Sequence, residues 1–194
     1  LFAGVDEKHF ESLVRLGRGS VEERASLNAH LASDPACPPK LIGILAKSRN
    51  YEVLSSLAGS QNCPATLLET LSKHEDFLVR KNVASNPNCP VTLLETLAQD
   101  KDPWVRGCVA INPNCSVTLL KALAQERDHW ESVASHPNCP VTLLKTLSKV
   151  KESDARGRVA SNPNCPVALL ESLAQDRDPW VRGCVAINPN CPVI

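Results

Sequence analysis

The feature that most constrains this sequence is a cysteine that recurs at a nearly fixed interval. Successive occurrences are 26, 26, 26, 24, 26 and 26 residues apart. The seven residues are Cys37, Cys63, Cys89, Cys115, Cys139, Cys165 and Cys191. A unit of this length holds one small supersecondary motif, which gains a core only by stacking on its neighbours. The period therefore predicts a solenoid of tandem repeats.

Two long blocks of the sequence are almost identical. Residues 83–117 and 159–193 differ at only four of 35 positions, at an offset of 76 residues. A block of three repeats has therefore been duplicated whole, so identity between the two copies does not mark functional residues. The positions at which repeats differ carry more information.

The residues after each cysteine predict a short first helix. We expect Pro90 in its first turn, where proline is tolerated, and Cys89 as its N-cap. Apolar residues follow at helical spacing, and the helix is expected to end near Gln99 and Asp100. The apolar positions are Val91, Leu93, Leu94, Leu97 and Ala98.

A second short helix is expected from Asp102 as N-cap and Pro103 in the first turn, either α or 3₁₀. It should end at the following Asn-Pro-Asn, because a residue before proline disfavours the α region. Asp102 and Arg106 are four residues apart and are expected to pair on the outer face. The same pairing is expected for Asp76/Arg80, Glu152/Arg156 and Asp178/Arg182. No stretch alternates like a strand, so the prediction is an all-α fold.

The Asn-Pro-Asn turns have two interpretations. One is a ligand site. The other, which we favour, is that asparagine side chains satisfy backbone groups of the turns between repeats. His136 replaces the first asparagine in one repeat and is expected to be a tolerated substitution.

The recurring pattern V-R-x-x-V-A-x-N-P-x-C-P-x-x-L-L-x-x-L-A-x-D-x-D resembles the leucine-rich repeat variant family. The resemblance is clear from Val83 onward and weaker in the repeats at Cys37 and Cys63. It implies a right-handed helical solenoid in which α-helices alternate with 3₁₀ helices, without a β-sheet. We expect the repeats over residues 31–194, the last one truncated, and an N-terminal helical cap over residues 1–30.

The resemblance also implies a second possible function. The founding bacterial member of the family carries a cysteine-rich domain with a [4Fe–4S] cluster before its repeats. Residues 1–30 contain no cysteine. If this chain is the repeat arm of an iron–sulfur protein, the cluster domain lies outside it.

Composition and motifs argue against several classes of function. Lys plus Arg and Asp plus Glu both total 21, so the chain lacks the basic excess of a general nucleic-acid binder. No stretch is long and apolar enough to span a membrane. No nucleotide-binding, hydrolase or metalloprotease motif is present, so we expect neither an enzyme nor a cofactor.

The cysteines are expected to be structural. Packed helices lie ~8–10 Å apart, whereas thiolates that share a zinc ion, or cysteines that form a disulfide, must lie closer. Cysteines in neighbouring repeats should therefore be buried, reduced thiols. Such a number of free thiols favours a cytoplasmic protein.

Three tryptophans form the main lead to a binding surface. Trp104, Trp130 and Trp180 are aligned with a position that holds Glu52, Leu78 and Asp154 in other repeats. A position that accepts Glu and Asp is not deep in the core, so the rings should be partly exposed beside Arg106 and Arg182. Exposed aromatic and arginine residues are typical of protein interfaces. The alternative is that each ring only covers its own helix start.

The repeat of 24 residues is the other irregularity. Its second helix, near residues 128–136, is expected to lack the equivalents of Val105 and Arg106. One interpretation is that this shortened segment forms a recognition site that includes His129 and Trp130. The other, which we favour, is that it is a tolerated deletion.

The sequence therefore predicts a monomeric, non-catalytic scaffold that binds a protein partner, with no nucleic acid and no membrane involved. The predicted partner-binding residues are Trp104, Arg106, His129, Trp130, Trp180 and Arg182.

Overall fold

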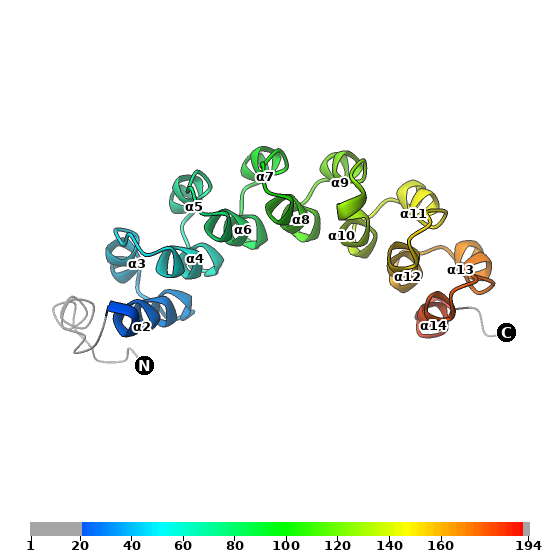
Figure 1. Cartoon of the computed structure of the whole chain (residues 1–194), viewed down its shortest axis with the longest axis horizontal. Helices are drawn as coiled ribbons and strands as arrows, with labels where there is room; N and C mark the ends of the chain where they lie inside the picture. Colours follow the sequence, from blue (N-terminus) through cyan, green and yellow to red (C-terminus); the bar gives the residue numbers. More distant parts are fainter. Residues whose placement is uncertain (1–20, 192–194) are drawn as a thin grey trace. The chain divides into compact units, whose positions relative to one another are not determined.

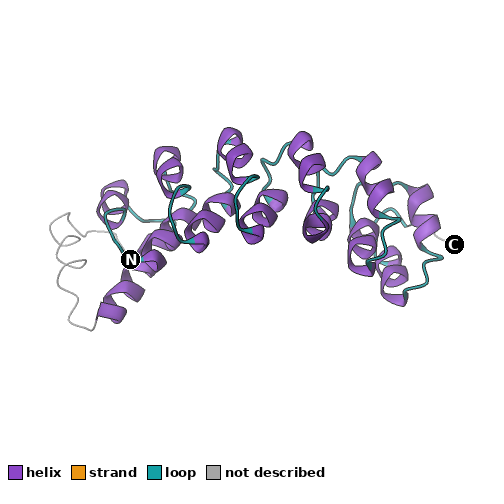
Figure 2. Cartoon of the chain, turned by 45° about the horizontal axis from the view of Figure 1, so that its top comes forward, coloured by secondary structure: helices purple, strands orange, loops and turns teal. Residues whose placement is uncertain are grey.

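A computed structural model describes residues 21–191 of the chain. These residues form helices joined by turns and contain no strand (Figure 2). The predicted all-α fold is therefore confirmed. The elements are α2 (Val21–Ser33), α3 (Pro39–Leu45), α4 (Tyr51–Gly59), α5 (Ala65–Leu71), α6 (Phe77–Ser85), α7 (Val91–Leu97), α8 (Pro103–Ile111), α9 (Val117–Leu123), η1 (Arg127–His129), α10 (Trp130–Ser135), α11 (Val141–Leu147), α12 (Ser153–Ser161), α13 (Val167–Leu173) and α14 (Pro179–Ala186).

Each repeat contributes a first helix of seven residues and a second helix of eight or nine residues, except in the short repeat, where α10 has six. The chain divides into two units, residues 1–105 and 106–194, with the boundary inside α8. Within each unit, the first helices follow one another along one side and the second helices along the other (Figure 1). Successive second helices pack on each other, as α4 does on α6 and α12 on α14. We call these two sets the first-helix row and the second-helix row.

The first helices begin one residue later than predicted. Pro90 is itself the N-cap of α7, in an extended conformation, and the helix starts at Val91. Proline has no side-chain acceptor, so these helices start without a capping hydrogen bond. Ser116 at the same position shows the alternative, since its Oγ accepts from the Leu119 backbone N at 3.2 Å.

The second helices begin as expected but are mostly α-helical. Asp178 caps α14, with Oδ1 2.9 Å from the Trp180 backbone N, and Pro179 occupies the first turn. The single 3₁₀ segment in the described part of the chain, η1, lies in the short repeat. The resemblance had implied 3₁₀ helices throughout. Each full second helix has eight or nine residues, enough for the i to i+4 bonding of an α-helix.

Leucines of the first helices and valines of the second helices form the core between the two rows. Leu94, Leu97, Val105 and Val109 are all buried. Val91 was predicted to belong to this core, but it is 44% exposed. It is the first residue of its helix, and its side chain lies outside the stripe that the leucines form.

At the N-terminal side, α2 packs on α4 in the manner of the later second helices. Residues 1–20 of the predicted N-terminal cap lie outside the described residues. The division into a cap over residues 1–30 and repeats over residues 31–194 stays a prediction.

Candidate interaction surface

Asparagines of the Asn-Pro-Asn turns tie each repeat to the one before it. Nδ2 of the buried Asn86 donates to the carbonyl oxygens of Ala58 at 2.6 Å and Ser60 at 2.8 Å. Its Oδ1 accepts from the Asn88 backbone N at 2.8 Å. Asn162 and Asn188 repeat this arrangement. The structural interpretation of these turns is therefore confirmed.

His136 takes the place of this asparagine in the short repeat. Its Nδ1 accepts from the Asn138 backbone N at 3.0 Å, and Nε2 lies 3.0 Å from the Asn112 carbonyl oxygen. Because Nδ1 accepts, the ring is the tautomer with its proton on Nε2, where it donates to the carbonyl. His136 therefore donates one hydrogen bond to a carbonyl oxygen of the preceding repeat, where the asparagine side chain donates two.

Arginines of the second helices form ion pairs between repeats, not within them. Arg80 Nε lies 2.7 Å from Asp100 Oδ2, and Arg156 Nε lies 2.6 Å from Asp176 Oδ2. The predicted pairs four residues apart, Asp102/Arg106 among them, are wrong for these arginines. Asp76 and Asp102 instead cap their own helices, as Asp76 does for Leu78 N, and Arg80 pairs with the acid twenty residues later.

Both pairs are buried and well bonded. Arg80 Nη1 also donates to the carbonyl oxygens of His74 and Glu75. Hydrogen bonding to Arg156 outweighs burial and holds the pKa of Asp176 below its ordinary value. Burial acts to raise the pKa of Asp100, but hydrogen bonds from Arg80 and the Asp102 backbone outweigh it and lower this pKa as well.

The short repeat lacks the first turn of its second helix. The prediction that it lacks the equivalents of Val105 and Arg106 is wrong. Val133 is buried like Val109, and counting back from that match places His129 at the position of Val105. His129 is buried, as Val105 is. The missing residues are therefore the equivalents of Pro103 and Trp104, and η1 replaces that turn.

Trp130 consequently occupies the position of an arginine and not that of Trp104. Its Nε1 donates to the Ala124 carbonyl oxygen at 2.9 Å, at the end of the preceding first helix. The residue twenty positions later, where an acid would stand, is Val150. Arginine and its acid partner have thus been replaced together. In the first unit, likewise, Leu54 stands at the arginine position and His74 at the position of its acid partner.

The repeated cysteines form no disulfide bonds within residues 21–191 and are mostly buried. Burial raises the pKa of Cys63, Cys89, Cys115, Cys139 and Cys165 to about 11. Such thiols are protonated at neutral pH and make poor nucleophiles or metal ligands. Within residues 21–191, no group of three or more His, Cys, Asp or Glu side chains is placed to hold a metal ion.

Trp104 and Trp180 are exposed at the starts of α8 and α14. Trp104 is 69% exposed and Trp180 44%. A Cβ atom at Gly157 would lie 1.9 Å from Trp180 Cζ3, so that ring rests directly on the backbone of α12. The residue equivalent to Gly157 for Trp104 is Lys81, twenty-three positions earlier in each case.

The two repeats before that of Trp104 each have an exposed aromatic residue at nearly the same position. Tyr51 and Phe77 are the first residues of α4 and α6 and are 43% and 37% exposed. Three successive second helices therefore begin with an exposed aromatic side chain. We call Tyr51, Phe77 and Trp104 the aromatic row. Comparing the repeats at the position of Trp104 does not reveal Tyr51 and Phe77, because they stand one position earlier, where Pro103 aligns.

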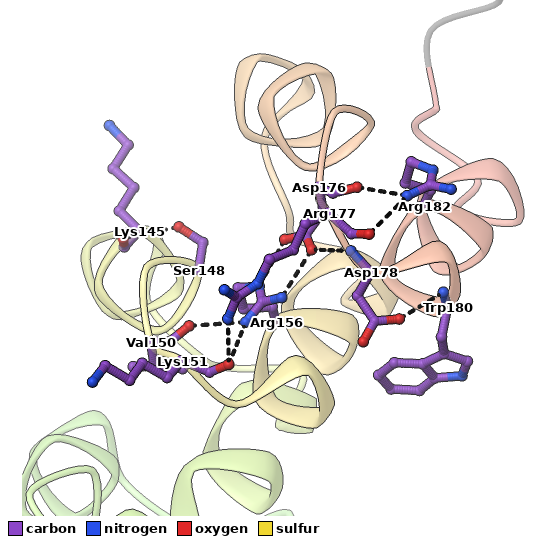
Figure 3. Close-up of polar contacts among 10 residues, drawn as sticks. All are labelled: Lys145, Ser148, Val150, Lys151, Arg156, Asp176, Arg177, Asp178, Trp180 and Arg182. Carbon is purple, nitrogen blue, oxygen red and sulfur yellow. Dashed lines mark hydrogen bonds and ion pairs between the residues drawn. The ribbon is translucent and has the colours of Figure 1, made fainter.

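The six predicted binding residues divide by exposure. Trp104, Trp180 and Arg182 are exposed. Arg106 is largely buried in an ion pair with Glu126 at 2.6 Å. His129 is buried, with Nε2 3.3 Å from Glu126 Oε2 and without the geometry of a hydrogen bond. Trp130 is half-buried. Figure 3 shows Trp180 and Arg182 on either side of Asp178.

No helix in the described part of the chain is long and apolar enough to cross a membrane.

Comparisons with known proteins agree with the repeat. The model of the leucine rich repeat variant family matches residues 77–102, which include α6 and α7. A solved structure described as a leucine-rich repeat variant with a novel repetitive protein structural motif matches with a TM-score of 0.62 and 24% identity. The match covers 91% of this chain and 70% of that one. An engineered protein matches at 17% identity over 94% of each chain, but its TM-score of 0.30 is too low to indicate a common fold. No curated protein matches this chain.

The resemblance noted in the sequence is therefore confirmed: residues 77–102 form a leucine-rich repeat variant unit, and the chain has the helical-repeat fold of the leucine-rich repeat variant.

Proposed function

We propose that the chain is a non-catalytic, cytoplasmic scaffold that binds a protein partner through its second-helix row. The observation that carries this proposal is the aromatic row of the first unit. Aromatic side chains are enriched at the centres of protein interfaces, where they bury much surface at little cost in conformational entropy. A water-soluble fold gains nothing from leaving three such residues exposed on consecutive helices.

The fold supports the same conclusion. The buried polar side chains named above hold the repeats together: the asparagines bridge turns, and buried arginines pair with acids. The iron–sulfur alternative gains no support from the matches.

The proposal is tested by alanine substitution of Phe77 and Trp104 in the whole chain. Proximity labelling in cells should recover a set of proteins with the wild type and lose it with the double variant. The control is Val91→Ala, which removes a similarly exposed apolar side chain from the first-helix row. Loss of the same proteins in the control, or their retention in the double variant, would refute the proposed surface.

A further inference from the structure

The second unit carries a row of basic side chains on a different set of turns. Arg127, Lys151 and Arg177 occupy the same repeat position, in the turn between the first and second helix. All three are exposed, and the side chain of Arg127 is 70% exposed even though it pairs with Glu152. We call these three residues the basic row.

Several acidic groups near the basic row are already engaged. Glu126 pairs with Arg106 and Asp176 pairs with the buried Arg156. Asp178 caps α14 through the Trp180 backbone N. Glu126, Asp176 and Asp178 are thus held by groups outside the basic row, whereas Glu152 pairs with Arg127 and Asp128 is exposed.

Further cations enlarge this positive edge. Lys145 on α11 and Lys149 just after it are exposed, and neither forms an ion pair within residues 21–191. In Figure 3, Lys145, Lys151 and Arg177 extend from neighbouring turns and helices of this unit. Residues 106–194 have ten Lys and Arg against eight Asp and Glu, whereas residues 1–105 have eleven against thirteen. The neutral total charge conceals this difference.

We propose that the basic row binds an acidic segment of a protein partner in an extended conformation. Helices in contact are ~8–10 Å apart, so successive residues of the basic row are separated by about that distance. A chain in the extended polyproline II conformation advances about 3.1 Å per residue and has about three residues per turn. Every third side chain therefore lies on the same face, and about three residues span one repeat. A segment with a carboxylate at about every third residue matches the row.

The spacing favours a peptide over a nucleic acid. Duplex DNA carries one negative charge per ~1.7 Å of its axis, and binders of such a polyanion place many cations close together. The basic row offers one charge per repeat, and the exposed Asp128 and Asp154 lie on the same unit. A sparsely charged ligand therefore fits this edge better. The inference concerns a different unit from the aromatic row and does not depend on the proposed function.

The test uses the whole chain and a fluorescent synthetic peptide with glutamate at every third position. A peptide of the same composition with its glutamates adjacent, and a single-stranded DNA oligonucleotide, serve as competing probes. Fluorescence anisotropy should show that the spaced peptide binds the most tightly. Binding should weaken from ~0.01 M to ~1 M salt, as the Debye length falls from about 30 Å to about 3 Å.

Charge reversal locates the binding edge. Lys151→Glu with Arg177→Glu should weaken binding about tenfold or more, since repulsion replaces attraction at two positions. The matched control, Lys47→Glu with Lys73→Glu, makes the same charge change at exposed positions of the first unit. Lys151→Gln with Arg177→Gln provides a milder variant, and thermal unfolding checks that each variant folds.

The proposal is overturned by any of three results: an equal loss in the control variant, tighter binding of DNA than of the spaced peptide, or no difference between the two peptides. Phe77→Ala with Trp104→Ala should leave peptide binding unchanged, so failure of this proposal and failure of the aromatic row are distinguishable.

Discussion

Two tryptophans at the same repeat position lie in different surroundings. Trp180 rests on Gly157 and is 44% exposed, whereas Trp104, with Lys81 at the equivalent position, is 69% exposed. The absence of a side chain at residue 157 is what lets the Trp180 ring approach the helix. The alternative from the sequence, that each ring only covers its own helix start, describes neither residue fully: the Trp180 ring lies on the middle of the neighbouring helix α12, and Trp104 is mostly exposed.

Gly157→Ala should displace the ring of Trp180. Its Cβ would meet three ring atoms between 1.9 and 2.6 Å away, so the ring must move into solvent. In a Trp104→Phe, Trp130→Phe background, tryptophan emission should shift to longer wavelength. The variant should be about 1 kcal/mol less stable than the matched control below, because apolar ring surface is re-exposed.

Gly183→Ala is that control. Gly183 has the same repeat position as Gly157, and its added Cβ meets nothing within 4 Å. Alanine should stabilise this helix by about 0.5–1 kcal/mol without a change in emission. An equal emission shift in both variants would show that the ring does not rest on Gly157.

His136 is the other residue whose role is set by local chemistry. His136→Asn should raise the free energy of unfolding by about 0.5–1.5 kcal/mol, because Nδ2 can donate to two carbonyl oxygens where the imidazole donates to one. Urea unfolding measures the difference. A variant less stable than the wild type would mean that the volume of the ring matters more than the second hydrogen bond.

At the scale of the element, ion pairs of Arg80, Arg106 and Arg156 join their second helices to the turn after the next first helix. Removing one member of a buried pair leaves an uncompensated charge. Asp176→Asn should therefore lower stability by about 3–5 kcal/mol, since Arg156 stays buried without its carboxylate.

The double variant Arg156→Leu with Asp176→Asn should recover part of that loss. Leucine stands at the arginine position in Leu54, and asparagine keeps an acceptor for the Asp178 backbone N. Chemical denaturation of the two variants decides the matter. A double variant at least as unstable as the single one would show that the cost does not come from a stranded charge.

The same pairs predict acid sensitivity. The folded-state pKa values of Asp100 and Asp176 are lowered, so these groups contribute stability at pH values above the ordinary carboxyl pKa of about 4. That contribution should be lost as the pH falls through the lowered folded-state values. Urea midpoints measured from neutral to acidic pH should fall less steeply for the Arg156→Leu, Asp176→Asn variant. Parallel curves would contradict this origin of the acid sensitivity.

The sequence predicted the helix pairs and the leucine core because both follow from local periodicity. It could not predict which acid Arg80 or Arg156 would choose, because the helix-capping role of the nearer aspartate and the stacking of the next repeat together decide that. The deletion was misplaced because His129 and Trp130 can be aligned with either end of the missing segment. Only the burial of His129 shows that the first turn is absent.

At the scale of the whole molecule, the repeat separates stability from recognition. Side chains that face the neighbouring repeat hold the repeats together, and these positions keep asparagine or the arginine–acid pair in most repeats. Positions at the starts of the second helices and in the turns vary more in character. The position of Trp104 holds Glu52 and Asp154 in other repeats, and the turn position of Arg127 holds Glu75. Recognition by such a scaffold is therefore expected from these varying positions.

Site-specific photo-crosslinking tests the proposed binding surface most directly. A benzoylphenylalanine placed at Phe77, on the aromatic row, and one placed at Val91, on the first-helix row, probe two exposed apolar positions of the same unit. On irradiation in cells, residue 77 should form a discrete crosslinked protein adduct that the Trp104→Ala substitution removes, and residue 91 should not. Adducts from residue 91 alone, or identical adducts from both positions, would contradict binding through the second-helix row.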